Sequence, residues 1–427
     1  MVLENSVVSS STSNNEQRND DVHIFVPQSE FHEFINSSGR HLTGSKPFEE
    51  DRINMLSKLG YQIMHCPALR SQGDAVAIAY WMRRSNLEKI KKDYYDHHTQ
   101  NPNFLIFPVG KVFHIAPSNV DSLFLYSWAL SFLCGNLNIV RLSSSQNKIV
   151  TAFLDCLIAI ADMFPELMSQ NLFLTCPHDS NALAVITQLC SHRVVWGGDE
   201  TIYKIRSIPL PAYASERCFA TKHSYSVISA SAVTQATVEE IAQLSRNIYN
   251  DIFQYNQKAC SSPQILFWLS SSHEVYLEAT RRLEAALSII VAELNNESPS
   301  ISDAVERFSY ACLVTAERPG DVQLHEGVFA SVAFAAIDPT IERESCGTGF
   351  LRHVPLSSLR DLDKFFTPSD QTITYYGLSK IRCEELLQIA ASNGIDRIVP
   401  VGRALDLMPV WDGFDLIGDF IRRVEFS

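Results

Sequence analysis

Apolar and polar positions follow two different spacings along the central part of the chain. Short apolar runs bounded by glycine, proline or polar residues predict strands at 22–26, 110–116, 138–142, 172–174, 193–196, 225–228 and 264–268. Apolar residues at helical spacing predict helices at 71–98, 123–134, 148–163, 182–189, 202–205 and 237–255. Strands that alternate with helices in this way are typical of βαβ units around a parallel sheet. We therefore expect an α/β fold.

Composition adds to this picture mainly by exclusion. The 427 residues are 46% hydrophobic and 19% charged, with a net charge of -13, and cations gather only between Arg83 and Lys92. Generic nucleic-acid binding needs clustered cations and is not expected. Residues 1–21 are polar without apolar periodicity, which predicts a disordered tail. The longest apolar stretches, 122–134 and 328–337, are too short to span a membrane.

The ten cysteines include no Cys-x-x-Cys pair, and no secretory signal precedes them, which favours a reduced, cytoplasmic protein. Cys260 differs from the others in its surroundings. Asn256, Gln257 and Lys258 precede it and two serines follow it, so its thiol is not expected inside an apolar core. Since the thiolate is the nucleophile, Lys258 and nearby backbone amides are the local groups that would activate it. A buried structural thiol is the ordinary alternative.

Three further segments carry candidate chemistry where strands end. Asn119 follows the strand at 110–116, where its amide could donate to an oxyanion, although from position alone a helix N-cap is the simpler explanation. Arg141, Ser143 and Ser144 end the strand at 138–142 and suit the ribose or 2′-phosphate of a nucleotide, or equally a solvated loop. The pair Gly197 and Gly198 would let a pyrophosphate approach the next helix.

Other catalytic classes lack their signatures. The histidines are scattered or sit as the pair His97-His98, so no set of four zinc ligands presents itself. No Gly-x-Ser-x-Gly, Gly-x-Gly-x-x-Gly or Walker-type loop occurs in the chain.

Taken together, these segments resemble the aldehyde dehydrogenase superfamily, and within it the bioluminescence-type fatty acyl-CoA reductases. The resemblance spans about 105 to 427. It is carried by Asn119, the Gly-Asn-(x)4-Arg-x-Ser stretch at 135–143, the pair Gly197 and Gly198, Asn-Gln-x-x-Cys at 256–260, and the closing segments 397–402 and 411–413. It implies an aldehyde dehydrogenase-like fold of two α/β domains: a Rossmann-like cofactor-binding domain at 22–225, to which 391–427 return unless they form the interface, and a catalytic thiol domain at 226–390.

The resemblance also implies roles for residues. Cys260 falls on the acyl-accepting thiol and Asn119 on the oxyanion asparagine. Arg141 replaces a lysine near the adenosine ribose, and Ser144 stands where NAD-preferring relatives often hold a glutamate. The loss of that carboxylate favours NADPH as the cofactor. Ser143 lies beside them, and Gly197 and Gly198 would border the pyrophosphate.

One departure from the superfamily bears on the reaction class. The stretch that corresponds to the general-base glutamate segment, 218–224, contains no acid, and Glu216 is out of register. Without a base to activate water, a thioacyl enzyme is released by thiol exchange or reduced by hydride. The resemblance thus implies NADPH-dependent reduction of a long-chain acyl thioester to the aldehyde. His223 is a candidate proton donor, although an exposed loop histidine is the simpler account.

The substrate implied is an acyl-CoA or an acyl-protein thioester, with an acyl-transferring protein as a candidate partner and a homo-oligomer as the expected assembly. Two alternatives stay open. One is an NAD(P)-dependent aldehyde dehydrogenase that oxidises aldehyde with Glu216 as its base. The other is a non-catalytic partner in an acyl-reducing complex.

Overall fold

The structure is a computed structural model, and it describes residues 22–26, 46–116, 122–143, 148–177, 180–294, 301–318, 322–326, 329–343 and 345–426. The tail predicted to be disordered, residues 1–21, lies outside this range. So do Asn119 and Ser144, two of the candidate site residues.

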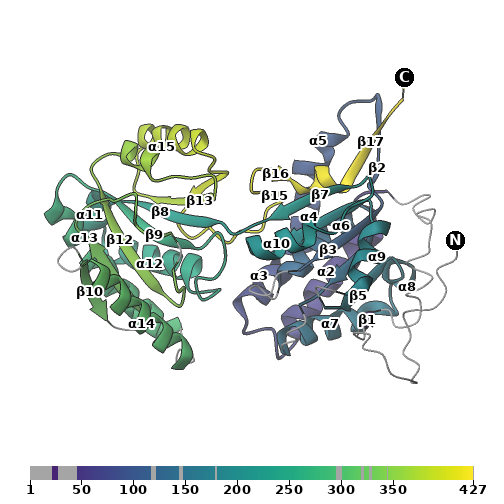
Figure 1. Ribbon diagram of the computed structural model, residues 1–427, viewed down its shortest axis with the longest axis horizontal. Helices are drawn as coiled ribbons and strands as arrows, with labels where there is room; N and C mark the ends of the chain where they lie inside the picture. Colours follow the sequence, from purple (N-terminus) through teal and green to yellow (C-terminus); the bar gives the residue numbers. More distant parts are fainter. Residues whose placement is uncertain are drawn as a thin grey trace. The chain divides into compact units, whose positions relative to one another are not determined.

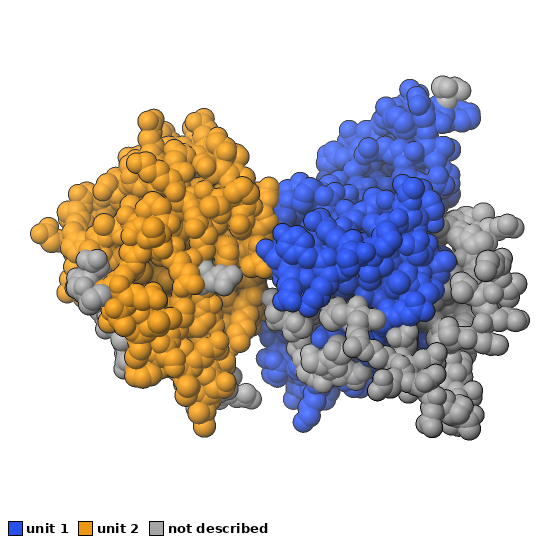
Figure 2. Space-filling model, in the orientation of Figure 1, with its two compact units in different colours: residues 1–220, 407–427 blue, residues 221–406 orange. Residues whose placement is uncertain are grey.

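The chain forms two compact units, coloured separately in Figure 2. Unit 1 comprises residues 1–220 and 407–427, and unit 2 comprises residues 221–406. These limits differ from the domain limits expected from the sequence. A boundary after residue 225 would cut a strand that runs from His223 to Ser229, and one after residue 390 would cut the helix Lys380–Ser392.

Unit 1 is built on a six-stranded sheet in the order β1-β5-β4-β3-β6-β7 (Figure 1). All neighbours are parallel except β1, which runs antiparallel to β5. The order reverses between β3 and β6, because the chain builds outward from β3 in one direction and then crosses back to place β6 on its other side. This is a doubly wound arrangement, in which ligands gather at the carboxyl ends of the strands beside the reversal.

The strands of unit 1 are β1 (His23–Val26), β2 (Phe104–Pro108), β3 (Lys111–Ile115), β4 (Leu137–Arg141), β5 (Asn171–Thr175), β6 (His192–Trp196), β7 (Ser215–Phe219), β15 (Val410–Trp411), β16 (Phe414–Asp415) and β17 (Ile421–Glu425). Its helices are α2 (Glu50–His65), α3 (Gly73–Trp81), α4 (Arg84–Ile90), α5 (Asp96–His98), α6 (Leu123–Leu133), α7 (Lys148–Ala161), α8 (Pro165–Met168), α9 (Asn181–Leu189), α10 (Asp199–Arg206) and α16 (Leu416–Phe420), with the π-helix η2 (Lys91–Tyr95).

Helices cover both faces of this sheet. Side chains of α9 and α10 pack with one face of β3, β4, β5 and β6 in a single apolar cluster. On the other face, Phe124 of α6 contacts Phe153 of α7 and Phe173 of β5. The C-terminal strand β17 pairs antiparallel with β2, which joins segments more than 300 residues apart. No local sequence pattern announces that pairing.

Unit 2 is built on a seven-stranded sheet in the order β10-β11-β12-β9-β8-β13-β14, parallel apart from β10 (Figure 1). Its strands are β8 (His223–Ser229), β9 (Pro263–Leu269), β10 (Val322–Glu326), β11 (Ala330–Phe334), β12 (Phe350–Leu356), β13 (Asp370–Tyr376) and β14 (Arg397–Pro400). Its helices are α11 (Ala230–Gln235), α12 (Val238–Ile252), α13 (His273–Leu294), α14 (Ile301–Glu317), the 3-10 helix η3 (Leu359–Lys364) and α15 (Lys380–Ser392).

The two faces of this sheet bury two separate apolar clusters. One cluster packs α11, α12 and α13 against Ile228, Leu266 and Trp268. The other packs α14, η3 and α15 against the opposite face, around Tyr225 and Phe267. Both faces of the central strands are therefore buried, as expected for a parallel sheet with helices on each side.

One predicted helix is wrong in extent. The segment 71–98 is not one helix, because α3 ends at Trp81 and α4 begins at Arg84 after an extended Arg83. The side-chain amide of Asn86 donates to the carbonyl oxygen of Trp81 at 2.7 Å. That hydrogen bond satisfies one of the carbonyl groups left open at the end of α3, so the break costs little.

Candidate functional site

Cys260 lies in the loop that connects α12 to β9, which we call the thiol loop (residues 253–262). The helix α12 ends at Ile252, three residues before the end expected from the sequence, and β9 begins at Pro263. The thiol is half-buried rather than part of either apolar cluster, and Lys258 beside it is exposed. No disulfide joins any of the ten cysteines. A partly exposed thiol that follows a lysine by two residues is a setting that suits a reactive cysteine.

The thiol loop has an unusual backbone. Asn256 and Gln257 both adopt the left-handed region, with φ of 52° and 61°, which residues other than glycine rarely occupy. The loop is held by main-chain hydrogen bonds, from Gln257 to the carbonyl of Ile252 at 2.7 Å and from Thr348 to the carbonyl of Asn256 at 2.8 Å. Such strain persists only where the surroundings enforce it, and it concentrates at functional sites.

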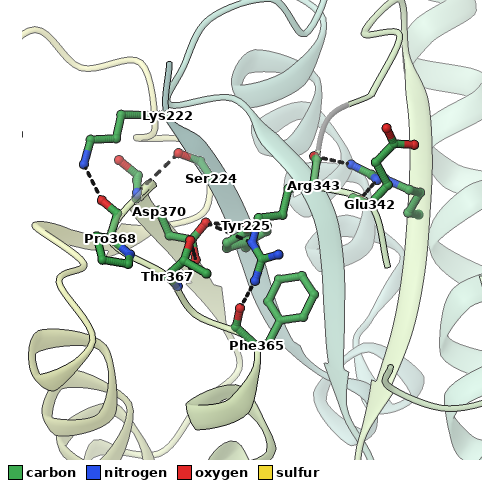
Figure 3. Close-up of polar contacts among 11 residues, drawn as sticks. Lys222, Ser224, Tyr225, Glu342, Arg343, Phe365, Thr367, Pro368 and Asp370 are labelled. Atoms are coloured by element: carbon green, nitrogen blue, oxygen red, sulfur yellow. Dashed lines mark hydrogen bonds and ion pairs between the residues drawn. The ribbon is translucent and has the colours of Figure 1, made fainter. Parts of the chain in front are cut away.

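The beginning of β8 supports the thiol loop. The hydroxyl of Ser224 donates to the carbonyl oxygen of Cys260 at 2.7 Å and accepts a hydrogen bond from the backbone N–H of Thr372 at 3.3 Å. Lys222, two residues before Ser224, donates to the carbonyl of Pro368 at 2.8 Å (Figure 3). Ser224 was not among the candidates from the sequence, because its contact with Cys260 joins residues 36 positions apart.

A buried carboxylate lies next to this support (Figure 3). Asp370, fully buried at the start of β13, accepts hydrogen bonds from the hydroxyl of Tyr225 and the backbone N–H of Thr367, both at 2.6 Å. Arg343 approaches the same carboxylate at 3.6 Å and stacks over the ring of Phe365. Burial, and then the nearby Asp370, raises the pKa of Tyr225. The phenol therefore stays protonated and keeps donating.

Arg352, on β12, ties this region to the start of β9. Its buried guanidinium donates to the carbonyl oxygens of Gln264 at 3.2 Å, of Arg343 at 2.8 Å and of Glu342. Burial lowers the pKa of this guanidinium, but the hydrogen bonds to carbonyl dipoles favour its charged form. Arg352 thus fixes the backbone of residues 342–343 against the start of β9, the strand that directly follows the thiol loop.

The candidate cofactor residues lie in unit 1, at the carboxyl ends of its strands. Gly197 and Gly198 follow β6, one of the two strands at which the sheet order reverses. A Cβ on Gly197 would lie 3.2 Å from Thr201 in the first turn of α10, so this position favours glycine. Asp199 and Glu200 already provide negative charge at the N-terminus of α10. These carboxylates offset the positive end of the helix dipole. A phosphate at this place would therefore be held by close approach to the backbone of the two glycines rather than by the dipole.

Arg141 provides the test of whether a nucleotide fits this edge. Its side chain is 1% exposed and donates through Nε to the carbonyl of Cys176 at 3.0 Å. Its Nη2 is buried and has no hydrogen-bond partner among the described residues. A buried guanidinium nitrogen left open at the carboxyl end of β4 fits an anionic or hydroxyl group of a dinucleotide. Ser143, two residues on, is half-buried.

Glu216 is held away from base chemistry. It accepts hydrogen bonds from Nε of Arg193 at 2.7 Å and from Nε of Arg206 at 3.0 Å within unit 1. Burial alone would raise the pKa of Glu216, but these arginines outweigh burial and hold it below its ordinary value. Glu216 is therefore an ionised ion-pair partner. His223, the candidate proton donor, begins β8 in unit 2 and is half-buried.

Comparison with known proteins agrees with this arrangement. The family model of the acyl-CoA reductases (LuxC) matches residues 78–423, most of the chain, including Cys260. The chain belongs to the acyl-CoA reductase (LuxC) family. The family predicted from the sequence is confirmed, and membership supports an oxidoreductase.

One curated relative of this acyl-CoA reductase family member is long-chain acyl-protein thioester reductase 2 of Photobacterium leiognathi. The two are 25% identical over 174 residues, which cover 40% of this chain and 34% of the relative. The match thus spans about a third of the relative's own length.

Solved structures show the fold of this family member. Betaine aldehyde dehydrogenase of Staphylococcus aureus superposes with a TM-score of 0.61 at 12% identity, covering 92% of this chain and 86% of that one. The 1-pyrroline-5-carboxylate dehydrogenase of Thermus, solved with bound NAD, gives 0.61 at 13% identity, covering 92% and 84%. The predicted aldehyde dehydrogenase-like α/β fold is confirmed.

The described part of the chain holds neither a metal-binding cluster nor a membrane-spanning helix. No group of three or more histidine, cysteine or acidic side chains is placed to hold a metal ion. None of the helices in the described part of the chain combines the length and the apolarity that crossing a bilayer requires.

Proposed function

We propose that this protein reduces a long-chain acyl thioester to the fatty aldehyde, with Cys260 as the acyl acceptor and NADPH as the reductant. The observation that carries the proposal is the family match over 78–423, and the partial match to a relative named for acyl-protein thioester reduction supports it. The half-buried thiol on a strained, clamped loop agrees with it. The acyl donor is acyl-CoA or an acyl-protein.

The chemistry of the first half-reaction follows from the thiol. The Cys260 thiolate attacks the thioester carbonyl, the bond to the donor sulfur breaks, and the donor thiol leaves with a proton. The acyl group is then a thioester on Cys260. We propose the backbone N–H of Cys260 and the amide of Asn119 as donors to the oxyanion that forms during attack.

A bound NADPH would supply the hydride for the second half-reaction. The reduced carbon remains bonded to Sγ of Cys260 until its hydroxyl loses a proton and the carbon–sulfur bond breaks, releasing aldehyde and restoring the thiol. One proton is consumed overall. Arg141, Ser143, Ser144, Gly197 and Gly198 are the residues that we propose to hold the cofactor, with Arg141 directed to the 2′-phosphate.

Glu216 weighs against the oxidising alternative. Hydrolysis of a thioacyl enzyme needs a base that is free to take a proton from water. Glu216 is ionised but occupied by Arg193 and Arg206. No observation favours the alternative of a non-catalytic partner, which the activity test below addresses.

The test compares palmitoyl-CoA-dependent NADPH oxidation by the wild type, Cys260→Ala and Cys312→Ala. Cys312 is an exposed thiol on α14 and serves as the matched control. We expect the Cys260 variant to lose activity at least a thousandfold, as loss of an essential nucleophile does, and the Cys312 variant to keep it. Equal rates in wild type and Cys260→Ala would contradict the proposal, as would a folded wild type that neither binds NADPH nor acquires an acyl adduct.

A further inference from the structure

The side chain of Gln257 closes the open end of the ladder between β9 and β12. Its Nε2 donates to the carbonyl oxygens of Pro263 at 3.0 Å and Phe350 at 3.1 Å, and its Oε1 accepts from the backbone N–H of Phe350 at 3.0 Å. Pro263 and Phe350 are the first residues of the two strands. The amide thus bonds to Phe350 as a strand peptide would.

These hydrogen bonds involve every donor and the acceptor of a side chain that is 1% exposed. A buried amide must be paired to be tolerated, and shortening it would leave Phe350 N–H and two carbonyls without this partner. The carbonyl of Gln257 is held as well, because Nε2 of Gln264 donates to it at 2.9 Å. Gln257 is therefore fixed at both its side chain and its main chain.

The backbone of Gln257 makes this fixation informative. Glycine would adopt a φ of 61° without strain, yet glutamine stands there, directly after Asn256 in the same region. The facing loop accommodates the strained pair closely. Gly347 itself has a φ of 70°, and a Cβ at this position would lie only 3.0 Å from the carbonyl oxygen of Asn256. The hydrogen bonds of the Gln257 side-chain amide thus hold the residue in a backbone conformation that glutamine rarely adopts.

Cys260 follows three residues later. Its own carbonyl is held by Ser224, so the segment from 257 to 260 is anchored at each end. We propose that Gln257 is a positioning residue that sets the orientation of the Cys260 thiol for acyl transfer. This inference rests on the proposed function of Cys260 as acyl acceptor. Gln257 acts through the backbone and does not itself touch the acyl group.

Gln257→Gly separates the two roles that the residue has. Glycine relieves the backbone strain but removes the side-chain amide. If Gln257 served only folding, the folded variant would turn over at close to the wild-type rate. We expect kcat for palmitoyl-CoA reduction to fall roughly 10- to 100-fold with KM for the donor changed less than about threefold, since misplacing a reacting group by about 1 Å costs this much in rate. Gln257→Asn keeps an amide but shortens the side chain by one methylene, so that the amide no longer reaches Phe350. We expect its kcat to stay below that of the wild type as well.

Ser226→Ala is the matched control. It removes a buried side-chain hydrogen bond, to Thr374 at 2.7 Å, from the same sheet without touching the thiol loop. We expect it to lower the melting temperature and leave kcat unchanged below that temperature. If Gln257→Gly behaves as this control does, the positioning role is wrong. Should the glycine variant not fold, Gln257→Asn carries the same comparison.

The readout that separates this inference from the proposed function is the rate at which Cys260 acquires a palmitoyl adduct in the absence of NADPH, followed by mass spectrometry. No adduct on Cys260 of the wild type would overturn the proposed function, and the inference with it. An adduct that forms equally fast in wild type and Gln257→Gly would overturn the inference alone. If the adduct forms on the wild type and forms at least tenfold more slowly on Gln257→Gly, the result supports both the proposed function and the inference.

Discussion

The carboxylate of Asp251 accepts a hydrogen bond from the backbone N–H of Gly402 at 2.6 Å, and a second from Ala404 at 2.9 Å. Asp251 is the second-last residue of α12, so it links the helix that leads to the thiol loop with the turn at 400–404, just before unit 2 ends at Asp406. Gly402, at φ 96°, leaves no space for a Cβ, which would lie 2.8 Å from Asn247.

This link predicts a pH-dependent stability. Burial raises the pKa of Asp251 to about 7, although the two backbone amides and Arg397 oppose the rise and Asp406 adds to it. Between the ordinary value of 3.8 and about 7 the folded chain holds a proton that the unfolded chain has released. Stability is therefore fully present below the lower value and falls as the pH rises through the upper one, by at most about 4 kcal/mol.

Asp251→Asn cannot titrate and removes this term. We expect the free-energy difference in urea unfolding between wild type and Asp251→Asn to favour the wild type more at pH 5 than at pH 8. The variant itself is destabilised at both values, because its amide NH₂ faces a backbone N–H. A difference that stays constant across this range would show that Asp251 is ionised throughout.

Glu216 carries a second prediction, which concerns the reaction class. Glu216→Gln breaks an ion pair whose arginine, Arg193, is 2% exposed, and should cost about 3 kcal/mol of unfolding free energy. Thioester reduction by the folded variant should stay within about twofold of wild type, because Glu216 takes no proton in the proposed reaction.

The control for this variant is Glu88→Gln. It breaks an exposed pair with Arg84 on α4 and should leave the free energy of unfolding almost unchanged, because water screens and replaces such a pair. If Glu216→Gln removes activity while remaining folded, a base role for Glu216 has to be reinstated.

The sequence was informative about elements whose partners are local. The strands from 110 to 196 and the three longer helices between them, α6, α7 and α9, were predicted within a few residues, because the apolar pattern of each segment reflects its own burial. The short helix α8 was not predicted. The pairing of β2 with β17 and the support of Cys260 by Ser224 were not predicted. Both depend on contacts between distant segments, which single-sequence periodicity does not report.

Gln257 shows the same limit within the candidate site. The sequence drew attention to Cys260 through its polar neighbours, and Gln257 was counted among them as a sign of exposure. The structure buries it instead, because Phe350, 93 residues away, supplies backbone partners for its amide. A polar residue near a candidate nucleophile is therefore as readily a buried clamp as a solvated neighbour. The left-handed backbone at 256–257 had no sequence signal, since neither residue is glycine.

Arg141 carries a prediction about cofactor choice. Arg141→Met keeps most of the side-chain volume but removes the buried nitrogen that has no partner among the described residues. If that nitrogen meets the 2′-phosphate, Kd for NADPH should rise roughly 10- to 100-fold, as loss of a charge-assisted hydrogen bond implies, and Kd for NADH should change little. Fluorescence titration of the same variant with both cofactors is its own control. Equal weakening of both would overturn the 2′-phosphate contact and leave Arg141 either a contact to a group that the two cofactors share or a folding role.

Tyr225 tests the cluster beneath the thiol loop. Tyr225→Phe removes the hydroxyl that donates to Asp370 at 2.6 Å, leaving a fully buried carboxylate with fewer donors. A hydrogen bond to a charged group contributes about 1.5 to 3 kcal/mol, so chemical denaturation should show a loss in that range. Tyr310→Phe is the matched control, because its hydroxyl donates at 3.3 Å to Glu342, an exposed carboxylate that water can serve equally well. Equal losses in the two variants would mean that Asp370 does not depend on Tyr225, and that Arg343 and the backbone of Thr367 suffice to hold it.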